Sequence, residues 1–298
     1  MKDLYGREIN YLRLSVTDRC NLRCRYCMPE EGICKKEHEF ILSEEEMVNA
    51  VKAASMLGFR KVRLTGGEPL VRKDIIEIAE QTFATDGIEE VCITTNGILL
   101  PEFAVPLRKA GVTRANISLD TLDPQKYAYI TRRGKLDDAM AGIEAALSAG
   151  FTKVKINTVL IGGFNDDEIA DLAALTEKYP IELRFIELMP MNDFGFGREA
   201  FVPGSLVWER LGGVRENIKL ISPISDSFCG KCNRIRITAD GKVKPCLHSR
   251  EELNIKGLGL EEMTDVLKEA IIGKPACHRE LSADHFSDAG RNMNQIGG

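Results

Sequence analysis

Three cysteines lie within eight residues near the start of the chain, in the stretch DRCNLRCRYCM. Cys20, Cys24 and Cys27 follow the spacing C-x3-C-x2-C, which lets one loop surround a compact metal cluster. Thiolates are the usual ligands of iron–sulfur clusters and of zinc. Three thiolates leave one iron of a four-iron cluster without a protein ligand, so a small molecule could bind and react there. The alternatives are a structural zinc completed by a distant His or Cys, or three unrelated buried thiols.

A second set of three cysteines lies in CGKCNRIRITADGKVKPCL, at Cys229, Cys232 and Cys246. Its spacing is compatible with a second iron–sulfur cluster and equally with a zinc site completed by a further ligand, for which the candidates are His248, Cys277 and His278. Within this stretch NRIRIT alternates like a strand, and ADGK supplies the turn after it. The remaining cysteines are scattered, and we expect them to be ordinary thiols: Cys34, Cys92 and Cys277.

Four basic residues each stand between apolar neighbours in short β-prone runs: Arg13, Arg63, Lys155 and Arg184. Side chains alternate across a strand, so the apolar neighbours face covering helices and the basic residues face the opposite side. Buried charges need partners, which are either carboxylates such as Glu187 and Asp120 or a phosphate-rich ligand. We favour the ligand for all of these except Arg184, which we assign to internal pairing. The chain has no G-x-x-x-x-G-K-[ST] loop, so side chains would have to bind the phosphates.

One pattern positions these residues: an amphipathic helix, a glycine that ends it, and a short β-prone run. The helix-ending glycines are Gly58, Gly111 and Gly150. Two helix starts carry a capping-box pattern, Ser43 with Glu46 and Asn165 with Glu168. Six strands are expected: YLRLSVTD, the run ending at Gly67, EVCITTNG, the run ending at Asp120, the run ending at Val159, and IELRFIELMP.

Alternating strands and helices predict a parallel sheet covered by helices, either doubly wound or a barrel. Six units are too few for a closed eight-fold barrel. In either architecture the reactive groups gather at the carboxyl ends of the strands. The polar residues expected there are the first cysteine loop, Thr65 to Glu68, Thr94 to Gly97, Ser118, Asp120 and Glu187.

Composition excludes several classes of protein. Asp plus Glu number 45 against 40 Lys plus Arg in 298 residues, a net charge of -5, so overall charge indicates neither nucleic acid nor a membrane as partner. The first ten residues, MKDLYGREIN, lack the apolar stretch of a signal peptide, and no run of about 18 apolar residues occurs. We therefore expect a cytoplasmic protein, whose reduced cysteines favour metal binding over disulfides.

The loop CNLRCRYC after a first strand, followed one strand–helix unit later by TGGEP, resembles the radical S-adenosylmethionine (SAM) enzymes. The resemblance implies a [4Fe-4S] cluster on Cys20, Cys24 and Cys27 whose open iron binds SAM. It also implies that Gly66, Gly67 and Glu68 lie near the SAM amino group. By the same resemblance, Tyr26, Ser118 and Met189 contact SAM, and the fold is a partial barrel of six βα units.

The second cysteine stretch resembles the signature of the GTP 3',8-cyclase family, also called molybdenum cofactor biosynthesis protein A. The resemblance implies a second [4Fe-4S] cluster on Cys229, Cys232 and Cys246, with an open iron that holds guanine. It assigns GTP contacts to Arg13, Arg63, Thr94, Lys155, Arg234 and Arg236. The chain ends in RNMNQIGG, and in the family this tail is thought to enter the active site, so Gly297 and Gly298 are catalytic candidates.

The combined expectation is an α/β protein with a partial (βα)6 barrel over residues 1–190 and a smaller C-terminal iron–sulfur domain over residues 191–298. It would use two [4Fe-4S] clusters and SAM to cyclise GTP to (8S)-3',8-cyclo-7,8-dihydroguanosine 5'-triphosphate. Its expected partners are GTP, an electron donor and a downstream cyclic pyranopterin monophosphate synthase, and we also consider a homodimer. The alternatives are a radical SAM enzyme that modifies a peptide and a non-catalytic metal-binding protein. The segment from Phe194 to Ser227 matches no motif.

Overall fold

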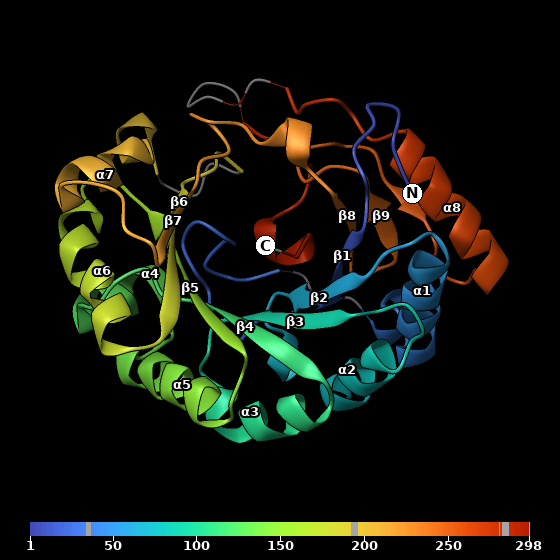
Figure 1. Ribbon diagram of the computed structural model, residues 1–298, viewed down its shortest axis with the longest axis horizontal. Coiled ribbons are helices and arrows are strands. Elements are labelled where there is room, and N and C mark those ends of the chain that lie inside the picture. The colour runs from blue at the N-terminus through green and yellow to red at the C-terminus, as the bar shows by residue number, and fades with distance from the viewer. Residues whose placement is uncertain (34–36, 192–195, 280, 282–285, 298) are drawn as a thin grey trace.

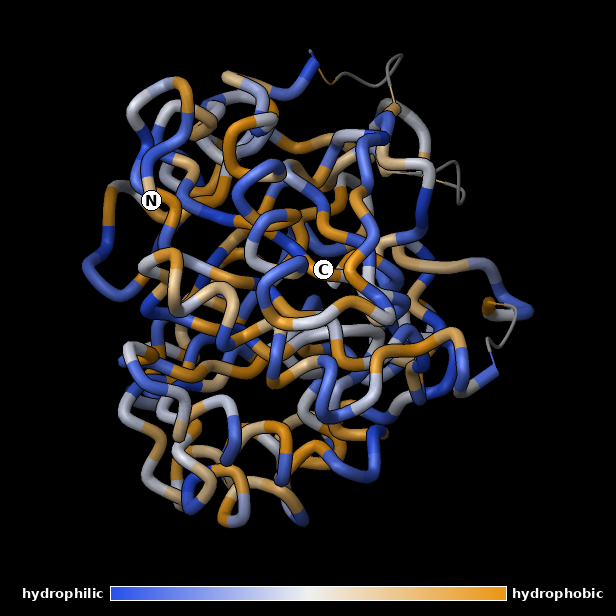
Figure 2. The backbone as a smooth tube through the Cα atoms, turned by 90° about the vertical axis from the view of Figure 1, so that its right-hand side faces the viewer, coloured by the Kyte–Doolittle hydropathy of each residue, from blue (hydrophilic) through white to orange (hydrophobic). Residues whose placement is uncertain are grey.

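The chain folds around one curved sheet of ten strands in the order β10-β9-β8-β1-β2-β3-β4-β5-β6-β7 (Figure 1). The structure is a computed structural model that describes every residue except 34–36, 192–195, 280, 282–285 and 298. Helices cover the outer side of the curve, and the C-terminal residues Met293–Gln295 lie inside it. Figure 2, turned by 90°, also places this segment in the middle of the molecule.

The six predicted strands are present, and each is parallel to its neighbours. They are β1 (Tyr11–Thr17), β2 (Lys61–Gly66), β3 (Glu90–Thr95), β4 (Val112–Ser118), β5 (Lys153–Leu160) and β6 (Ile181–Glu187). The helices between them are α1 (Glu44–Met56), α2 (Ile75–Phe83), α3 (Leu100–Lys109), α4 (Pro124–Thr131), α5 (Leu136–Ser148) and α6 (Ile169–Lys178). The prediction of an α/β partial barrel is confirmed.

Local signals set several of the helix ends. Ser43 accepts a hydrogen bond from the backbone of Glu46, whose side chain accepts one from the backbone of Ser43, so the predicted capping box is confirmed. The three predicted terminating glycines all have positive φ, between 74° and 89°, a conformation that L-residues with a Cβ rarely adopt: Gly58, Gly111 and Gly150.

The second predicted capping box is wrong. Asn165 begins a short 3-10 turn, and α6 starts only at Ile169. The Asn165 amide donates instead to the carbonyl oxygens of Asp120 and Val159, so it closes the loop after β5. Glu168 accepts from the Thr121 hydroxyl rather than from a helix terminus.

The two faces of the sheet differ in chemistry. On the helix-covered face, alternate strand residues such as Leu12, Val62 and Ile93 are fully buried in the main hydrophobic core. On the inner face, the intervening residues are polar and aligned in rows across the strands, for example Arg236, Arg13, Arg63 and Cys92. The inner face therefore collects the charged and hydrogen-bonding side chains of consecutive strands.

Strands from the last third of the chain extend the same sheet at both edges. β7 (Ile218–Ile221) pairs in parallel with β6, and β8 (Arg234–Ile237) pairs in parallel with β1. β9 (Lys242–Lys244) and β10 (Leu253–Asn254) follow as antiparallel neighbours, which confirms the predicted strand and turn in NRIRITADGK. Helix α7 (Ser205–Leu211) lies within the segment that matched no motif, and α8 (Leu260–Ile272) packs against α1. A domain boundary at residue 190 would thus divide a continuous sheet.

Six short 3-10 turns complete the described elements: η1 (His38–Phe40), η2 (Pro69–Val71), η3 (Asp166–Glu168), η4 (Arg198–Ala200), η5 (Cys229–Lys231) and η6 (Met293–Gln295). Within the described residues, every helix is too short or too polar to span a bilayer.

Candidate functional site

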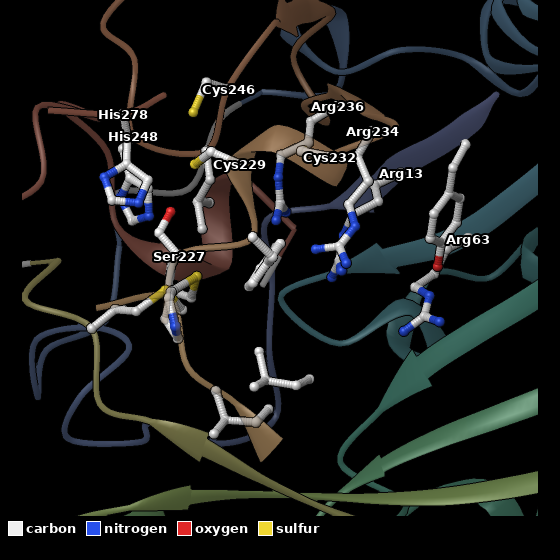
Figure 3. Close-up of a pocket in the computed structure, with 18 of the residues that line it drawn as sticks. Arg13, Arg63, Ser227, Cys229, Cys232, Arg234, Arg236, Cys246, His248 and His278 are labelled. Atoms are coloured by element: carbon white, nitrogen blue, oxygen red, sulfur yellow. The ribbon is translucent and has the colours of Figure 1, made fainter. Parts of the chain in front are cut away.

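A cavity of about 300 Å³ opens on the inner face of the sheet (Figure 3). Among its described lining residues, eight are cationic and none is Asp or Glu: Arg13, Lys61, Arg63, Arg114, Arg184, Arg234, Arg236 and Lys274. Figure 3 shows Arg13, Arg63, Arg234 and Arg236 toward one end, and Cys229, Cys246, His248 and His278 toward the other. Although the chain as a whole carries a net charge of -5, positive charge is concentrated in this cavity.

The arginines crowd one another. Burial and the neighbouring Arg236 and Arg63 hold the pKa of Arg13 well below its usual range. Burial and Arg234 lower the pKa of Arg236 to about 10. Because like charges at close range raise the free energy of the site, a polyanion between these side chains would relieve the repulsion.

Two carboxylates outside the cavity lining offset part of this charge. Glu182 on β6 forms ion pairs with Lys153, Lys155 and Arg184, each at 2.7 Å. Burial alone would raise the pKa of Glu182, but these bonds hold it at about 2. Glu90 on β3 pairs with Lys61 and Arg114 in the same way.

Neither carboxylate proposed from the sequence neutralises the basic strand residues. Glu187 accepts hydrogen bonds from the backbone of Gly204, Ile224 and Ser225. Asp120 accepts from Tyr26 and from the backbone of Val159. Arg184 pairs internally, as expected, and also lines the cavity.

Lys155 differs from the other expected ligand-binding cations. It is 3% exposed, bound to Glu182, and not among the residues that line the cavity. Burial lowers its pKa to about 8, although Glu182 opposes the shift. Thr94 accepts a hydrogen bond from Arg63 Nη1 at 3.2 Å and likewise lies behind the lining residues.

The first cysteine loop follows β1 and brings three thiols together. Burial and the other thiols of the loop raise the pKa of Cys24 well above its usual range and that of Cys27 to about 12. Burial and the Glu68 carboxylate raise the pKa of Cys20 to about 11. Three mutually repelling thiolates in a buried loop fit a metal cluster, since bound metal replaces the protons and compensates the charge.

The loop after β2 is pressed against this cysteine loop. A Cβ on Gly66 would come within 2.3 Å of the Thr17 carbonyl oxygen, and a Cβ on Gly67 within 2.3 Å of the Arg19 carbonyl oxygen. The backbone N–H of Gly67 donates to Thr17 at 2.8 Å, and that of Glu68 donates to Arg19 at 2.8 Å. Only glycines allow this contact, which fixes the position of Glu68 relative to the cysteines.

Glu68 is almost fully buried, at 1% exposed. It accepts hydrogen bonds from the Thr95 hydroxyl and from the backbone of Asn96 and Leu70. Burial nevertheless raises its pKa to about 7.

The remaining residues expected at the SAM site lie at the same carboxyl-end level of the sheet. The Tyr26 hydroxyl donates to Asp120 at 2.7 Å, and burial raises the pKa of Asp120 to about 6. Ser118 ends β4 and is aligned with Asn157 of β5. Met189 follows β6 and lines the cavity.

The second cysteine set lines the cavity directly at Cys229, Cys232 and Cys246. Burial would raise the pKa of Cys232, but Lys274 and Arg234 outweigh it and lower the pKa. The cationic surroundings therefore favour the thiolate form of Cys232, in contrast to the cysteines of the first loop.

Two further donors lie beside this set. The ligand atoms of Cys229, Cys277 and His278 are all within 4.8 Å of one another. Cys277 had been expected to be an ordinary thiol, or in the zinc alternative a fourth ligand, and its position next to Cys229 favours the second of these interpretations. Cys92 does fit an ordinary thiol, buried on β3 and donating to Glu90 at 2.7 Å, whereas Cys34 lies outside the described residues.

The C-terminal tail reaches the first cysteine loop and the arginines of the cavity. The Gly297 carbonyl oxygen accepts from Arg13 Nη2 at 3.0 Å and from Arg236 Nη1 at 2.6 Å. Asn294 donates from its side chain to the Asp18 carbonyl oxygen, and its backbone bonds to Cys27. Gly298 lies outside the described residues.

Sequence reasoning missed several lining residues: Lys61, Arg114, Asn116, Asn157 and Lys274. For four of them a signal existed. Lys61 lies two positions before Arg63, Arg114 and Asn116 lie two apart on β4, and Asn157 lies two positions after Lys155. The period of two that identified Arg63 and Lys155 therefore also applies to these residues.

Comparisons with known proteins agree with this geometry. Residues 14–176 match the Radical SAM superfamily, and residues 208–280 match Molybdenum Cofactor Synthesis C. The chain therefore belongs to the radical SAM superfamily. Relatives named GTP 3',8-cyclase include one from Alkaliphilus oremlandii, 48% identical over the whole of both chains, and one from Peptoclostridium acidaminophilum, 46% identical over 99% of this chain and 98% of the relative. Within the superfamily, the chain is a member of the GTP 3',8-cyclase family.

Solved structures share the fold at low sequence identity. Streptococcus suis SuiB bound to S-adenosylmethionine superposes with a TM-score of 0.69 at 18% identity, over 87% of this chain and 65% of SuiB. The anSMEcpe structure with bound AdoMet has a TM-score of 0.65 at 16% identity, over 92% of this chain and 80% of the other. This chain thus matches just under two thirds of SuiB. These likenesses concern the fold.

Proposed function

We propose that this protein cyclises GTP to (8S)-3',8-cyclo-7,8-dihydroguanosine 5'-triphosphate, the first step of molybdenum cofactor biosynthesis. The supporting observation is a cavity with Cys229 and Cys246 toward one end, Arg13 and Arg63 toward the other, and no carboxylate among its described lining residues. A purine nucleotide has the matching order of groups, with metal-binding base nitrogens at one end and a polyanion at the other.

The proposed substrate contacts are Arg13, Arg63, Thr94, Lys155, Arg234 and Arg236. Their role is to hold the triphosphate, since guanidinium groups bind phosphate oxygens in a fixed geometry. A radical reaction between two atoms of one substrate requires those atoms at roughly 3 to 3.5 Å, which is a positioning task. When the substrate binds, Lys155 would either leave Glu182 for the triphosphate or contact both groups. Gly297 and Gly298 are proposed as catalytic residues. In support, the Gly297 carbonyl oxygen accepts hydrogen bonds from Arg13 and Arg236, two of the proposed substrate contacts.

In the proposed SAM site, Cys20, Cys24 and Cys27 hold a [4Fe-4S] cluster. When bound and cleaved by one electron, SAM would supply a 5'-deoxyadenosyl radical to abstract the hydrogen at C3' of GTP. C3' would then bond to C8, and a second electron from the donor together with a proton would complete the 7,8-dihydro ring. Glu68 has the charge and position to accept the SAM amino group, with Gly66 and Gly67 giving backbone access. Tyr26, Ser118 and Met189 complete the proposed contacts at the carboxyl ends of the strands.

For the second centre we propose another [4Fe-4S] cluster, held by Cys229, Cys232 and Cys246. A mononuclear zinc is the second candidate, because Cys277 and His278 lie within ligand distance of Cys229. Anaerobically prepared protein should contain about eight irons if both clusters are present. If the protein instead contains one zinc per chain, and the variants Cys277→Ser and His278→Ala lose it, the second centre is a zinc site and not an iron–sulfur cluster.

The reaction needs an electron donor, and its product needs an acceptor enzyme. We propose a cyclic pyranopterin monophosphate synthase as that acceptor. Cytoplasmic location and a homodimer remain predictions from the sequence.

The deciding experiment incubates the anaerobically reconstituted protein with SAM and dithionite, with and without GTP. We expect 5'-deoxyadenosine and a new guanine-derived product to rise together only when GTP is present. Formation of 5'-deoxyadenosine without consumption of GTP would contradict the proposal that GTP is the substrate, and it would favour a peptide-modifying enzyme. Formation of neither product would favour a non-catalytic metal protein.

A further inference from the structure

Asn116 is a fully buried polar side chain whose hydrogen-bonding groups are not used. It lies on β4, is 0% exposed, and lines the cavity. Neither its Nδ2 nor its Oδ1 has a hydrogen-bond partner among the described residues. A buried amide without partners costs about 1–3 kcal/mol, so such a group is expected to bind a ligand that supplies the missing bonds.

Its neighbours in the same row of the sheet are already paired. Asn116 is aligned with Thr94 of β3 on one side and with Lys155 of β5 on the other. Thr94 accepts from Arg63, and Lys155 donates to Glu182. Asn116 therefore lies between two residues whose side chains already have partners. Its amide is left to bond with a group in the cavity.

The level of Asn116 in the barrel indicates which part of a ligand it meets. Arg114 lies two residues before it, about 7 Å away along the strand, toward the cationic end. Ser118 lies two residues after it, at the carboxyl end near the first cysteine loop. Asn116, in the same row as Lys155, thus lies between the row of Arg114 and the carboxyl-end level at which the radical is expected to form.

The chemistry of the amide narrows the choice further. A carboxamide both donates and accepts, whereas phosphate oxygens only accept and would leave Oδ1 unsatisfied. A ribose hydroxyl both donates and accepts, and can satisfy either amide atom. We infer that Asn116 binds a ribose hydroxyl of the substrate GTP and positions the sugar for the reaction at C3'. This inference rests on the proposed function, and it deepens that function by assigning a sugar contact.

The test uses the anaerobically reconstituted full-length protein and equilibrium binding of GTP, 2'-deoxy-GTP, 3'-deoxy-GTP and SAM. In Asn116→Ala and in Asn116→Leu, GTP affinity should fall roughly 3- to 10-fold, as for one lost hydrogen bond. Wild-type protein should bind one of the two deoxy analogues roughly 3- to 10-fold more weakly than GTP, because that analogue lacks the hydroxyl bound by Asn116. The two variants should bind that analogue and GTP with equal affinity. SAM affinity should not change.

A stability measurement separates ligand binding from a structural role. Because Leu fills a similar volume and removes the unsatisfied groups, the Tm of ligand-free Asn116→Leu should equal or exceed that of the wild type. The matched control is Cys92→Ala, which alters a buried side chain on the inner face of β3 outside the cavity lining, and it should leave GTP affinity unchanged.

Three results would overturn the inference. The first is that the Asn116 variants lose the same factor of affinity for GTP and for both deoxy analogues, and the second is that they lose SAM affinity while GTP affinity is retained. The third is that ligand-free Asn116→Leu has a lower Tm than the wild type. If the wild type cyclises GTP and the variants bind it normally, this inference fails and the proposed function stands. If the wild type does not bind GTP, both fail.

Discussion

Arg63 combines deep burial with an unsatisfied donor. It is 6% exposed, its Nη1 donates to Thr94, and its Nε has no partner among the described residues. Hydrogen bonds to charged groups contribute about 1.5–3 kcal/mol, so Arg63→Ala should weaken GTP binding roughly 10- to 100-fold while the fold survives. Equilibrium binding and a thermal melt check both parts.

The control for this change is Arg60→Ala. Arg60 immediately precedes β2 and pairs with Glu89 at the exposed surface, so its loss should leave GTP affinity unchanged. If Arg63→Ala also leaves GTP affinity unchanged, Arg63 does not bind the triphosphate.

Lys155 gives the site a pH dependence. Since burial lowers its pKa to about 8, the side chain is charged below that pH and loses its proton as the pH rises through it. Attraction to the triphosphate should therefore be complete below pH 8 and weaken above it. In Lys155→Arg the guanidinium stays charged, so GTP affinity measured from pH 7 to 9 should lose this step. Parallel profiles of variant and wild type would show that Lys155 does not contact the substrate.

At this scale the alternation of residues along strands was sufficient to predict that Arg13 and Arg63 reach the cavity. It did not predict the pairing of Lys155, because the partner Glu182 comes from a neighbouring strand and their meeting depends on register. Spacing alone could not choose among His248, Cys277 and His278 as a further ligand of the second set, since the proximity of Cys277 and His278 to Cys229 arises from the path of the chain after α8.

The loop after β2 has little room for change. A Cβ on Gly67 would overlap the Arg19 carbonyl oxygen, so Gly67→Ala must separate this loop from the cysteine loop. We expect a loss of about 1–3 kcal/mol in the free energy of unfolding, and loss of the iron bound by the first loop with the second site retained. Iron analysis and denaturant unfolding measure the two effects.

Gly259→Ala is a matched control, since Gly259 has φ of −75° and only a side-chain oxygen at 3.6 Å near its added Cβ. It should keep all its iron. Full iron content in Gly67→Ala would mean that the two loops form independently.

Helices and strands were predictable where a local signal fixed them, as at Ser43 and at the three terminating glycines. Asn165 had the same kind of signal and failed. Its amide satisfies two carbonyl oxygens at the end of β5, and that tertiary demand outweighs the local capping preference.

For the molecule as a whole, Glu187 links the barrel to the C-terminal region. It is 1% exposed and accepts hydrogen bonds from Gly204, Ile224 and Ser225. Glu187→Ala would leave these donors unsatisfied, so the free energy of unfolding should fall by about 2–4 kcal/mol. Glu187→Gln, which keeps one acceptor, should lose less. Equal stability of all three proteins in denaturant would contradict this role.

The same carboxylate predicts an acid dependence. Burial would raise the pKa of Glu187, but the hydrogen bonds from Ser225 and the backbone lower it below the ordinary value of 4.5. Its contribution to stability is therefore present above pH 4.5 and is lost as the pH falls further. Unfolding curves of wild type and Glu187→Ala should converge in that acidic range.

The sequence predicted the six-stranded core of the sheet but not its extension. Pairing of β8 with β1 joins residues that local patterns cannot relate, as in the bond from Asn233 to Asn10, 223 positions apart. The sheet continues at both edges into the C-terminal region, and a boundary between residues 190 and 191 stays a prediction from the motifs.

The pairing of β1 with β8 also has a consequence during synthesis. The edge of β1 stays open until the strand 223 positions later has left the ribosome, roughly 10–45 s at 5–20 residues per second. During that interval the nascent chain already displays Cys20, Cys24 and Cys27, without the tail that later bonds to the same loop. A metal-loading factor would then have its easiest access, and oxygen would have the same opportunity. Slowing translation after β6 should therefore increase oxidative damage to the first cysteine loop more than to the second set.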